Sequence, residues 1–195
     1  SNTWIEERYA GFKGSIGDHF TYSGKVASNK LTNQPLFIND TSLSSDGKSF
    51  QVVYANLNVL NLGGEIGYNV EEKLSVITSL NFNQFTGLEG QKKGWGMLPL
   101  EFNTPVRYQV IKDLWLKADL FAWDGPRYLR KDGNDGKLKG AFDLNAGLEF
   151  KVKKNISLWT QFNNIFNQEY QRWNQYPVYG FNFVGGVIFS FDQKN

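Results

Sequence analysis

The chain offers few side chains for nucleophilic or metal chemistry. It has one histidine, His19, and no cysteine. The missing cysteine excludes disulfides, thiol nucleophiles and cysteine zinc sites, and a single histidine excludes a multi-histidine metal centre. His19 follows a predicted turn, so we interpret it as a strand-end residue rather than a catalytic base. Since no nucleophile and base pair emerges, a hydrolase is a weak alternative. We expect no enzyme activity and no cofactor.

One acidic loop has oxygen ligands close together. Residues 132–136 read DGNDG, but they lack the acidic spacing and the closing glutamate of a calcium loop. We therefore interpret this segment as a hairpin or loop tip, and the Asp46-Gly47 pair as a turn. No metal site is predicted.

Aromatic side chains are the remaining candidates for binding. Aromatic faces on long loops stack on sugars, peptides or cofactors, and the alternative is that they pack loops together or anchor a membrane interface. The candidate ligand contacts are Trp95, Trp123, Tyr128, Trp173 and Tyr176.

These aromatic residues must be positioned by strands, because the hydrophobic pattern has period two. In residues 138–152 the even positions are apolar or small, and the odd positions are largely polar. A strand separates such sets onto two faces and a helix does not. Similar rows occur at residues 3–13, 20–26, 60–70, 74–82, 98–110, 114–123 and 179–191. The pattern predicts about nine antiparallel strands, several of them twelve or more residues long, which is enough to cross a bilayer.

Short and long connections alternate along the chain. Short turns are predicted at residues 16–18, 71–73, 111–113 and 153–155, and long segments at 28–49, 86–97, 124–137 and 167–178. This arrangement predicts an all-β up-and-down meander with its tight turns at one end and its long loops at the other. The spacing also resembles that of propeller repeats, but a propeller blade has four short strands where this pattern has two long ones.

Composition separates two barrel classes only provisionally. The net charge of +2 gives no reason to expect nucleic acid, and no stretch approaches the roughly 20 apolar residues of a membrane helix. A membrane barrel turns its apolar rows toward lipid, whereas a soluble lipocalin-like barrel turns them inward around one ligand. The Asn, Ser, Gly and charged rows favour a wet interior. Aromatic residues near the loop end fit either an interfacial girdle or loop packing; they are Phe85, Trp95, Trp123, Tyr128, Tyr170, Trp173, Tyr176 and Tyr179.

The C-terminal third carries a family resemblance. Residues 142–150 (FDLNAGLEF), 158–173 (LWTQFNNIFNQEYQRW) and 176–191 (YPVYGFNFVGGVIFSF) resemble the end of TonB-dependent outer-membrane receptors, most of all the large barrels of Bacteroidota. Residues 9–14 and 37–41 match similar segments upstream. The NNIFN run and the aromatic last strand are the specific parts.

The resemblance implies part of a plugged barrel of about 22 strands that imports a bulky nutrient with energy relayed by TonB. The implied partners are outer-membrane lipid, the TonB system and an unknown nutrient ligand, and the implied location is the bacterial outer membrane. Residues 1–195 are then one barrel domain, the C-terminal portion of a larger barrel. We interpret Ser1-Asn2 as a remnant of processing or cloning. Residues 192–195 depart from the family, whose last strand often ends on the aromatic.

Two further expectations concern the two faces of the sheet. The charged residues of the polar rows are expected to pair across strands; they are Glu65, Glu101, Arg107, Lys117, Asp119, Asp143 and Glu149. An isolated segment of this kind would expose a large apolar surface. We therefore expect the sheet to curl over its Leu, Phe and Val rows or to pair with a second copy.

Overall fold

The computed structural model describes residues 2–40, 42 and 48–191. Within these residues the chain is all β, and no helix is long and apolar enough to cross a membrane. Nine strands form one antiparallel sheet in the order β1-β2-β3-β4-β5-β6-β9-β10-β13. Their bounds are β1 Trp4–Ile16, β2 Phe20–Asn39, β3 Phe50–Val70, β4 Leu74–Glu89, β5 Leu100–Ile111, β6 Leu114–Trp123, β9 Ala141–Lys153, β10 Ile156–Asn163 and β13 Asn182–Phe189. The predicted fold class is confirmed.

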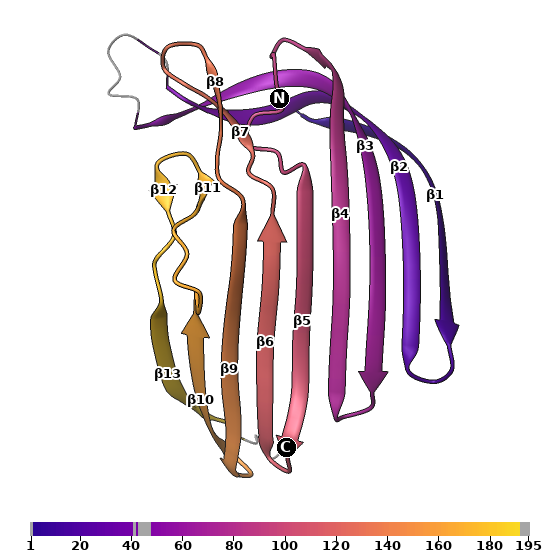
Figure 1. Cartoon of the computed structure of the whole chain (residues 1–195), viewed down its shortest axis with the longest axis vertical. Helices are drawn as coiled ribbons and strands as arrows, with labels where there is room; N and C mark the ends of the chain where they lie inside the picture. Colours follow the sequence, from indigo (N-terminus) through magenta and orange to yellow (C-terminus); the bar gives the residue numbers. More distant parts are fainter. Residues whose placement is uncertain (1, 41, 43–47, 192–195) are drawn as a thin grey trace.

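The tight turns lie at one end of the sheet, as the sequence predicts. Figure 1 shows the connections β1–β2, β3–β4, β5–β6 and β9–β10 together at the lower edge. Left-handed backbone closes three of them, with φ of +60° at Gly17, +58° at Glu72 and +66° at Asp113. Such turns match the twist of the flanking strands and keep the hairpins in register.

The alternation separates the two faces of the sheet. An apolar row crosses four neighbouring strands through Val26, Leu62, Phe82 and Leu100, all of which are exposed. One residue along, Asn61 pairs with Asn83 on the opposite face, and its amide donates a 2.8 Å hydrogen bond to the Asn83 side chain. A shift of register by one residue would exchange these two faces.

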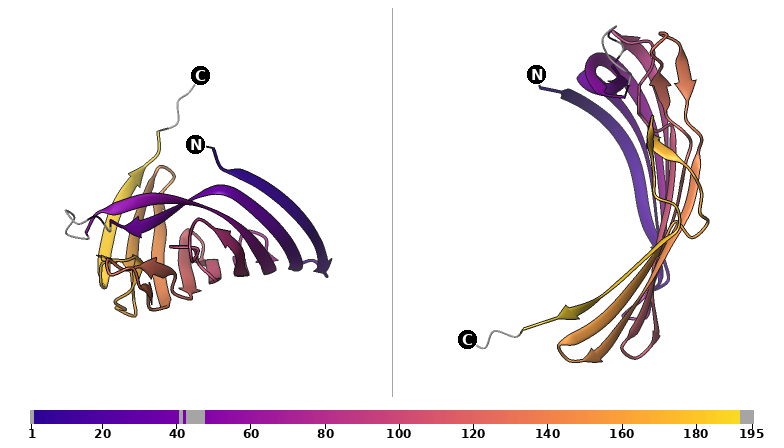
Figure 2. Two further views of the ribbon diagram at one scale, coloured as in Figure 1. Left: turned by 90° about the horizontal axis from the view of Figure 1, so that it is seen from above. Right: turned by 90° about the vertical axis from the view of Figure 1, so that its left-hand side faces the viewer.

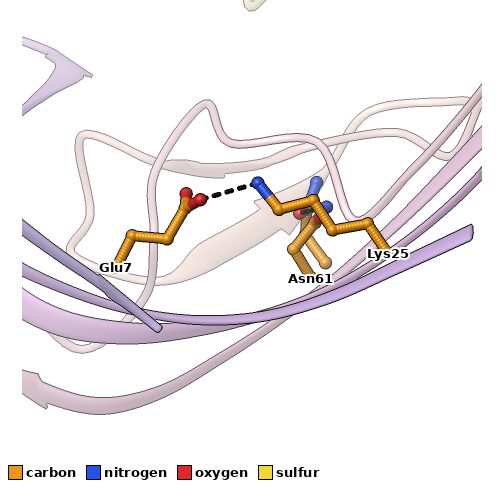
Figure 3. A network of polar contacts seen from close by, with 4 residues as sticks. Glu7, Lys25 and Asn61 are labelled. Carbon is orange, nitrogen blue, oxygen red and sulfur yellow. Dashed lines mark hydrogen bonds and ion pairs between the residues drawn. The ribbon is translucent and has the colours of Figure 1, made fainter. Parts of the chain in front are cut away.

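The sheet curves toward its polar face. Figure 2 shows the edge strands β1 and β13 bending to the same side, and Figure 3 shows Glu7, Lys25 and Asn61 projecting from one face of the sheet. Lys25 Nζ lies 2.6 Å from Glu7 Oε1. The expectation that the sheet curls over its Leu, Phe and Val rows is therefore wrong, because those rows lie outward and are exposed in the single chain. Pairing with a second copy stays a prediction.

The first predicted loop is largely strand. Residues 28–39 continue β2, and β3 begins at Phe50, so residues 40–49 alone connect the two strands. The alternation is interrupted by a β-bulge between Leu31 and Gln34, where Asn33 has φ of +60° and its N–H donates to Asn56 Oδ1 at 2.9 Å. A bulge turns each side chain beyond it to the other face and bends the strand. This interruption hides the strand from a period-two search.

The other long connections carry structure of their own. Residues 124–137 include the hairpin β7 (Arg127–Leu129) and β8 (Asp135–Lys137), and residues 167–178 include β11 (Gln171–Trp173) and β12 (Tyr176–Pro177). β4 extends to Glu89 and so includes the first four residues of the loop predicted from residue 86. The predicted turn at Asp46-Gly47, the departure at residues 192–195 and Ser1 lie outside the described residues.

The buried core sits at the loop end. Beyond the bulge, the β2–β3 hairpin bends over the concave face, and Figure 1 shows it running across the loop end of the sheet toward β11–β12. We call this segment, residues 34–39 and 50–55, the strap. Its buried side chains pack with neighbouring strand and loop residues in one cluster: Leu31, Leu36, Ile38, Ala55, Leu57, Val59 and Trp95.

Candidate functional site

The strap is clasped to the β11–β12 hairpin by aromatic rings. Phe37 packs edge-on against Trp173 with ring centroids 5.5 Å apart, and Phe50 stacks on Tyr176 at 5.2 Å. Asn174 Nδ2 donates a 2.9 Å hydrogen bond to Asn39 Oδ1 beside these rings. Two segments separated by about 135 residues in the sequence are thus in contact at the loop end of the curved sheet. Trp173 and Tyr176, both candidate ligand contacts, lie together here.

We call the contacts of Phe37 with Trp173 and of Phe50 with Tyr176 the clasp. A cationic side chain lies next to it. The Arg172 guanidinium lies 4.6 Å from the centre of the Trp173 ring and donates to the Gly96 carbonyl at 3.0 Å. Burial lowers the pKa of Arg172, and the negative charge of Glu101 opposes that shift. A cavity of about 380 Å³ opens between the strap and the β4–β5 connection. Its polar lining comes from Gln34, Asn83, Glu101 and Arg172.

Trp95 is positioned differently from the other candidates. Its side chain is only 2% exposed and packs in the buried cluster under the strap, and its Nε1 donates to Gln91 Oε1 at 3.0 Å. Tyr170 is likewise buried, and Phe85 packs against the same cluster as Trp95. For Trp95 and Tyr170 the girdle interpretation is wrong and loop packing is correct, because their rings are covered by the chain itself, whereas Phe85 is only partly buried.

Trp123 belongs to a second aromatic group on the concave face. Its ring stacks on Phe121 at 5.3 Å and meets Tyr170 edge-on at 5.1 Å. The Tyr170 hydroxyl donates a 2.9 Å hydrogen bond to Asp143 Oδ2. Burial is the main cause that raises the pKa of Tyr170, followed by this hydrogen bond and by the charge of Asp143. Tyr128 lies in β7, with the Arg130 guanidinium 6.0 Å from its ring centre.

Three buried polar atoms near this group have no hydrogen-bond partner within the described chain. They are Asp119 Oδ1, Asp143 Oδ1 and Trp123 Nε1. Asp119, Asp143 and Trp123 all come from β6 and β9, which are neighbours in the sheet. Such atoms carry a desolvation cost that a bound water or a ligand group would relieve.

The predicted pairing of polar-row charges holds in one case. Lys117 Nζ lies 2.5 Å from Glu149 Oε2. Asp143 instead accepts its bond from Tyr170, and no ion pair joins any other two of the seven charges in the described residues. The strand register explains why Arg107 forms no such pair. Its two cross-strand neighbours are Lys117, which has the same charge, and Ser75, which has none.

The two minor candidates, His19 and residues 132–136, lie at hairpin connections. His19 lies in the β1–β2 turn, where its Nδ1 is 2.9 Å from the Asn69 carbonyl and its ring meets Tyr68 edge-on. Residues 132–134 lie in the tip of the β7–β8 hairpin, and residues 135–136 begin β8. Hydrogen bonds from the Asn134 backbone and side chain lower the pKa of Asp132. No group of three possible metal ligands occurs in the part of the chain that the structure describes.

The NNIFN run, residues 163–167, has a structural role that spacing alone did not reveal. Asn164 is buried with φ of +49°; its amide donates to the carbonyls of Gln168 and Tyr179 and accepts from the Gln168 N–H. These bonds close the connection that presents Trp173 and Tyr176. The sequence reasoning also missed Arg172, Phe37 and Phe50. The strap that positions the two phenylalanines was hidden by its bulge.

Solved structures share this architecture. The ferric-catecholate import receptor Fiu from E. coli K12 matches 97% of this chain over 28% of its own, with a TM-score of 0.73 and 16% identity. Pyoverdine-bound FpvA from P. aeruginosa matches 96% of this chain over 27% of its own, at TM-score 0.72 and 10% identity. The siderophore receptor PiuA from Acinetobacter baumannii matches 95% over 28%, at TM-score 0.69 and 13% identity. No protein-family model and no curated protein matches the chain.

These similarities establish the fold. The nine-stranded sheet is a segment of the barrel fold of outer-membrane import receptors, and the chain spans between a quarter and a third of the length of the receptors it matches. The resemblance to TonB-dependent receptors inferred from the sequence is thereby confirmed at the level of fold. The matched proteins are transport receptors and not enzymes, and the ferripyoverdine receptor among them is one of the outer membrane.

Proposed function

We propose that this chain is part of the wall of a TonB-dependent outer-membrane receptor that imports a bulky nutrient. The mechanism is binding and transport, with no bond made or broken. TonB would act on the whole protein. The loop end, which carries the strap and the β11–β12 hairpin, would face outside the cell.

The observation that carries the proposal is the direction of the apolar face. Rows such as Val26–Leu62–Phe82–Leu100 lie outward on a curved sheet whose inner face carries amides and charges. In water so large an exposed apolar surface would favour association, whereas lipid would cover it without cost. The curvature and the patterning are therefore those that a bilayer-spanning wall needs.

The alternative, a soluble lipocalin-like barrel, fits the structure poorly. Such a barrel closes on itself and points its apolar rows inward. Within the described residues the sheet is open, since β1 and β13 do not pair, and the apolar rows point outward. The structure therefore favours the membrane barrel over this alternative.

The aromatic candidates receive different roles in the proposal. Trp173 and Tyr176, which are 36% and 54% exposed, would contact the ligand from the clasp. Trp123 and Tyr128 would contact the ligand from neighbouring positions at the loop end of the sheet. Trp95 would contribute as a wall of the 380 Å³ cavity rather than as a free stacking face, because most of its ring is covered.

Single cysteines test location and orientation together. The chain has no cysteine of its own, so Asp132→Cys at the β7–β8 tip and Lys112→Cys at the β5–β6 turn give reporters at the two ends. They would be placed in the whole protein in its own bacterium and treated with a membrane-impermeant maleimide. We expect labelling of Asp132→Cys on intact cells, and of Lys112→Cys only after the outer membrane is opened. Recovery of the protein in the soluble fraction, or equal labelling of both ends, would contradict the proposal.

A further inference from the structure

A second cavity at the loop end is lined by basic side chains. It measures about 340 Å³ and lies between the β4–β5 connection and the base of the β7–β8 hairpin. Its basic lining residues are Lys92, Lys93, Arg127 and Lys137, and the acidic lining residue is Asp124. None of these residues belongs to the aromatic set that the sequence singled out.

The positive charge of this cavity is only partly neutralised. Lys137 Nζ lies 2.7 Å from Asp124 Oδ2, and Arg127 Nη1 lies 2.5 Å from Asp135 Oδ2. Lys92 and Lys93 have no acidic partner among the described residues. The four cations of the lining face two carboxylates, Asp124 in the lining and Asp135 beside it, which leaves a local excess of +2.

Lys137 and Arg127, although paired with carboxylates, stay available to a ligand anion. The paired side chains are between 41% and 49% exposed, so solvent screens these pairs and each contributes little to stability. A ligand anion that enters the cavity can therefore exchange with Asp124 or Asp135 at small cost. Lys92 and Lys93 need no such exchange.

Apolar side chains form the rest of the cavity wall. They come from the end of β4 and from the connection to β5, and they are Phe85, Leu88, Met97 and Pro99. Phe85, Leu88 and Met97 also pack against the buried cluster under the strap, so that this wall is fixed in place. A small inorganic anion would leave the apolar wall in contact with water, whereas a ligand with an apolar body would cover it.

We infer that this cavity binds a ligand that carries two anionic groups on an apolar or aromatic body. The anionic groups, which can be carboxylate, sulfonate or phosphate, would meet the Lys92 and Lys93 ammonium groups, and the body would lie on the Phe85 and Met97 wall. The inference rests on the proposed function and gives it a ligand class. Anionic groups on an apolar body occur both in free solutes and in lipids with phosphate-bearing head groups.

The binding test uses pyrenetetrasulfonate, a water-soluble polyanion with a flat apolar body. The whole protein is purified in non-ionic detergent, and probe binding is measured by fluorescence anisotropy. The double variant Lys92→Gln/Lys93→Gln removes two charges from the cavity. The matched control, Lys73→Gln/Lys112→Gln, removes two exposed lysines from turns at the opposite end.

We expect the cavity variant to weaken probe binding about tenfold, and the control to leave it unchanged. Binding should also weaken as salt is raised, since exposed charges are screened. Equal weakening by the two double variants, or no binding to the wild type, would overturn the inference. Repeating the assay in nanodiscs that contain lipopolysaccharide separates the sources, because a lipid ligand displaces the probe and a solute site retains it.

The outcome is independent of the location test. A protein that passes the cysteine labelling but binds no probe keeps the proposed function and loses the anionic ligand class. A protein that binds the probe but fractionates as soluble keeps the anion site and loses the receptor function.

Discussion

Tyr170 donates a 2.9 Å hydrogen bond to Oδ2 of Asp143, and the two residues are only 7% and 2% exposed. The bond ties the β10–β13 connection to the wall of the sheet, because Tyr170 lies in that connection and Asp143 lies in β9. Asp143 Oδ1 has no partner in the described chain, so the Tyr170 hydroxyl is the one neutral donor that the structure gives to this carboxylate. We therefore expect this bond to contribute more to local stability than a hydrogen bond at an exposed position would.

The substitution Tyr170→Phe removes the donor and leaves a buried carboxylate without a partner. We expect the β10–β13 connection to lose about 1–3 kcal/mol of local stability. Hydrogen exchange of the amides in residues 164–181 measures this loss. In the double variant Tyr170→Phe/Asp143→Leu the buried charge is absent, and most of the protection should return. A double variant that is as unprotected as Tyr170→Phe would show that the hydrogen bond is not the cause.

The same residue predicts a dependence on alkaline pH. Burial and Asp143 raise the pKa of Tyr170 above its ordinary value of 10.0. A group whose pKa is higher in the folded state contributes stability below its unfolded pKa, and that stability is lost as pH rises toward the folded value. The local protection of residues 164–181 should thus be constant below pH 10 and fall above it.

Tyrosinate absorbance tests the pKa shift directly. Because its pKa is raised, Tyr170 should ionise at a higher pH than the exposed tyrosines, so wild type and Tyr170→Phe should give the same absorbance change in the ordinary tyrosine range near pH 10. An amplitude that is smaller by one tyrosine in the variant would contradict the shift.

Two tryptophans at the loop end should respond to truncation in opposite ways. Trp95→Ala empties a position in the buried cluster under the strap and should cost about 3–5 kcal/mol of local stability, seen as faster hydrogen exchange in residues 31–38 and 55–59. Trp173 is 36% exposed, so Trp173→Ala should cost much less there and should instead weaken ligand binding. Equal destabilisation by both variants would show that the clasp is a packing element only.

The bend of the strap depends on one residue with positive φ. Asn33 has φ of +60°, a conformation that costs a β-branched residue about 1–2 kcal/mol. We expect Asn33→Val to loosen the strap and Asn33→Gly to preserve it. The pair Asn39→Cys/Asn174→Cys reports the result, because these side chains are in contact across the clasp. A short bis-maleimide should link the pair in the Asn33→Gly background and much less in the Asn33→Val background, whereas equal linkage in both would refute the role of the bulge.

The sequence predicts the part of the fold that has local periodicity. Alternation from Leu60 to Val70 and from Ala141 to Val152 persists because each side chain faces either the outer or the inner side of the sheet, so these strands, their turns and their faces follow directly. The strap does not follow, because the bulge at Asn33 inverts the alternation. The clasp between Phe37 and Trp173 depends on that bend and on a contact between distant segments, and no local pattern encodes either one.

The direction of the apolar face gives the last prediction. Leu80 is 48% exposed on the outer face, between Gly64 and Phe102, while the next residue, Asn81, lies on the inner face opposite Glu101. If lipid covers the outer face, Leu80→Lys places a charge near the middle of the bilayer and costs about 2–4 kcal/mol. Asn81→Lys adds the same charge one residue away, where the interior is wet and Glu101 is a partner in register.

We therefore expect Leu80→Lys to reduce the amount of heat-modifiable, folded barrel in the outer membrane severalfold, and Asn81→Lys to leave it near wild type. Semi-native gel electrophoresis of the outer-membrane fraction measures both variants of the whole protein. The comparison holds the charge, the strand and the depth almost constant and changes only the face. Two variants that assemble equally well would mean that lipid does not cover the Leu80 face, and the membrane-wall proposal would then fail.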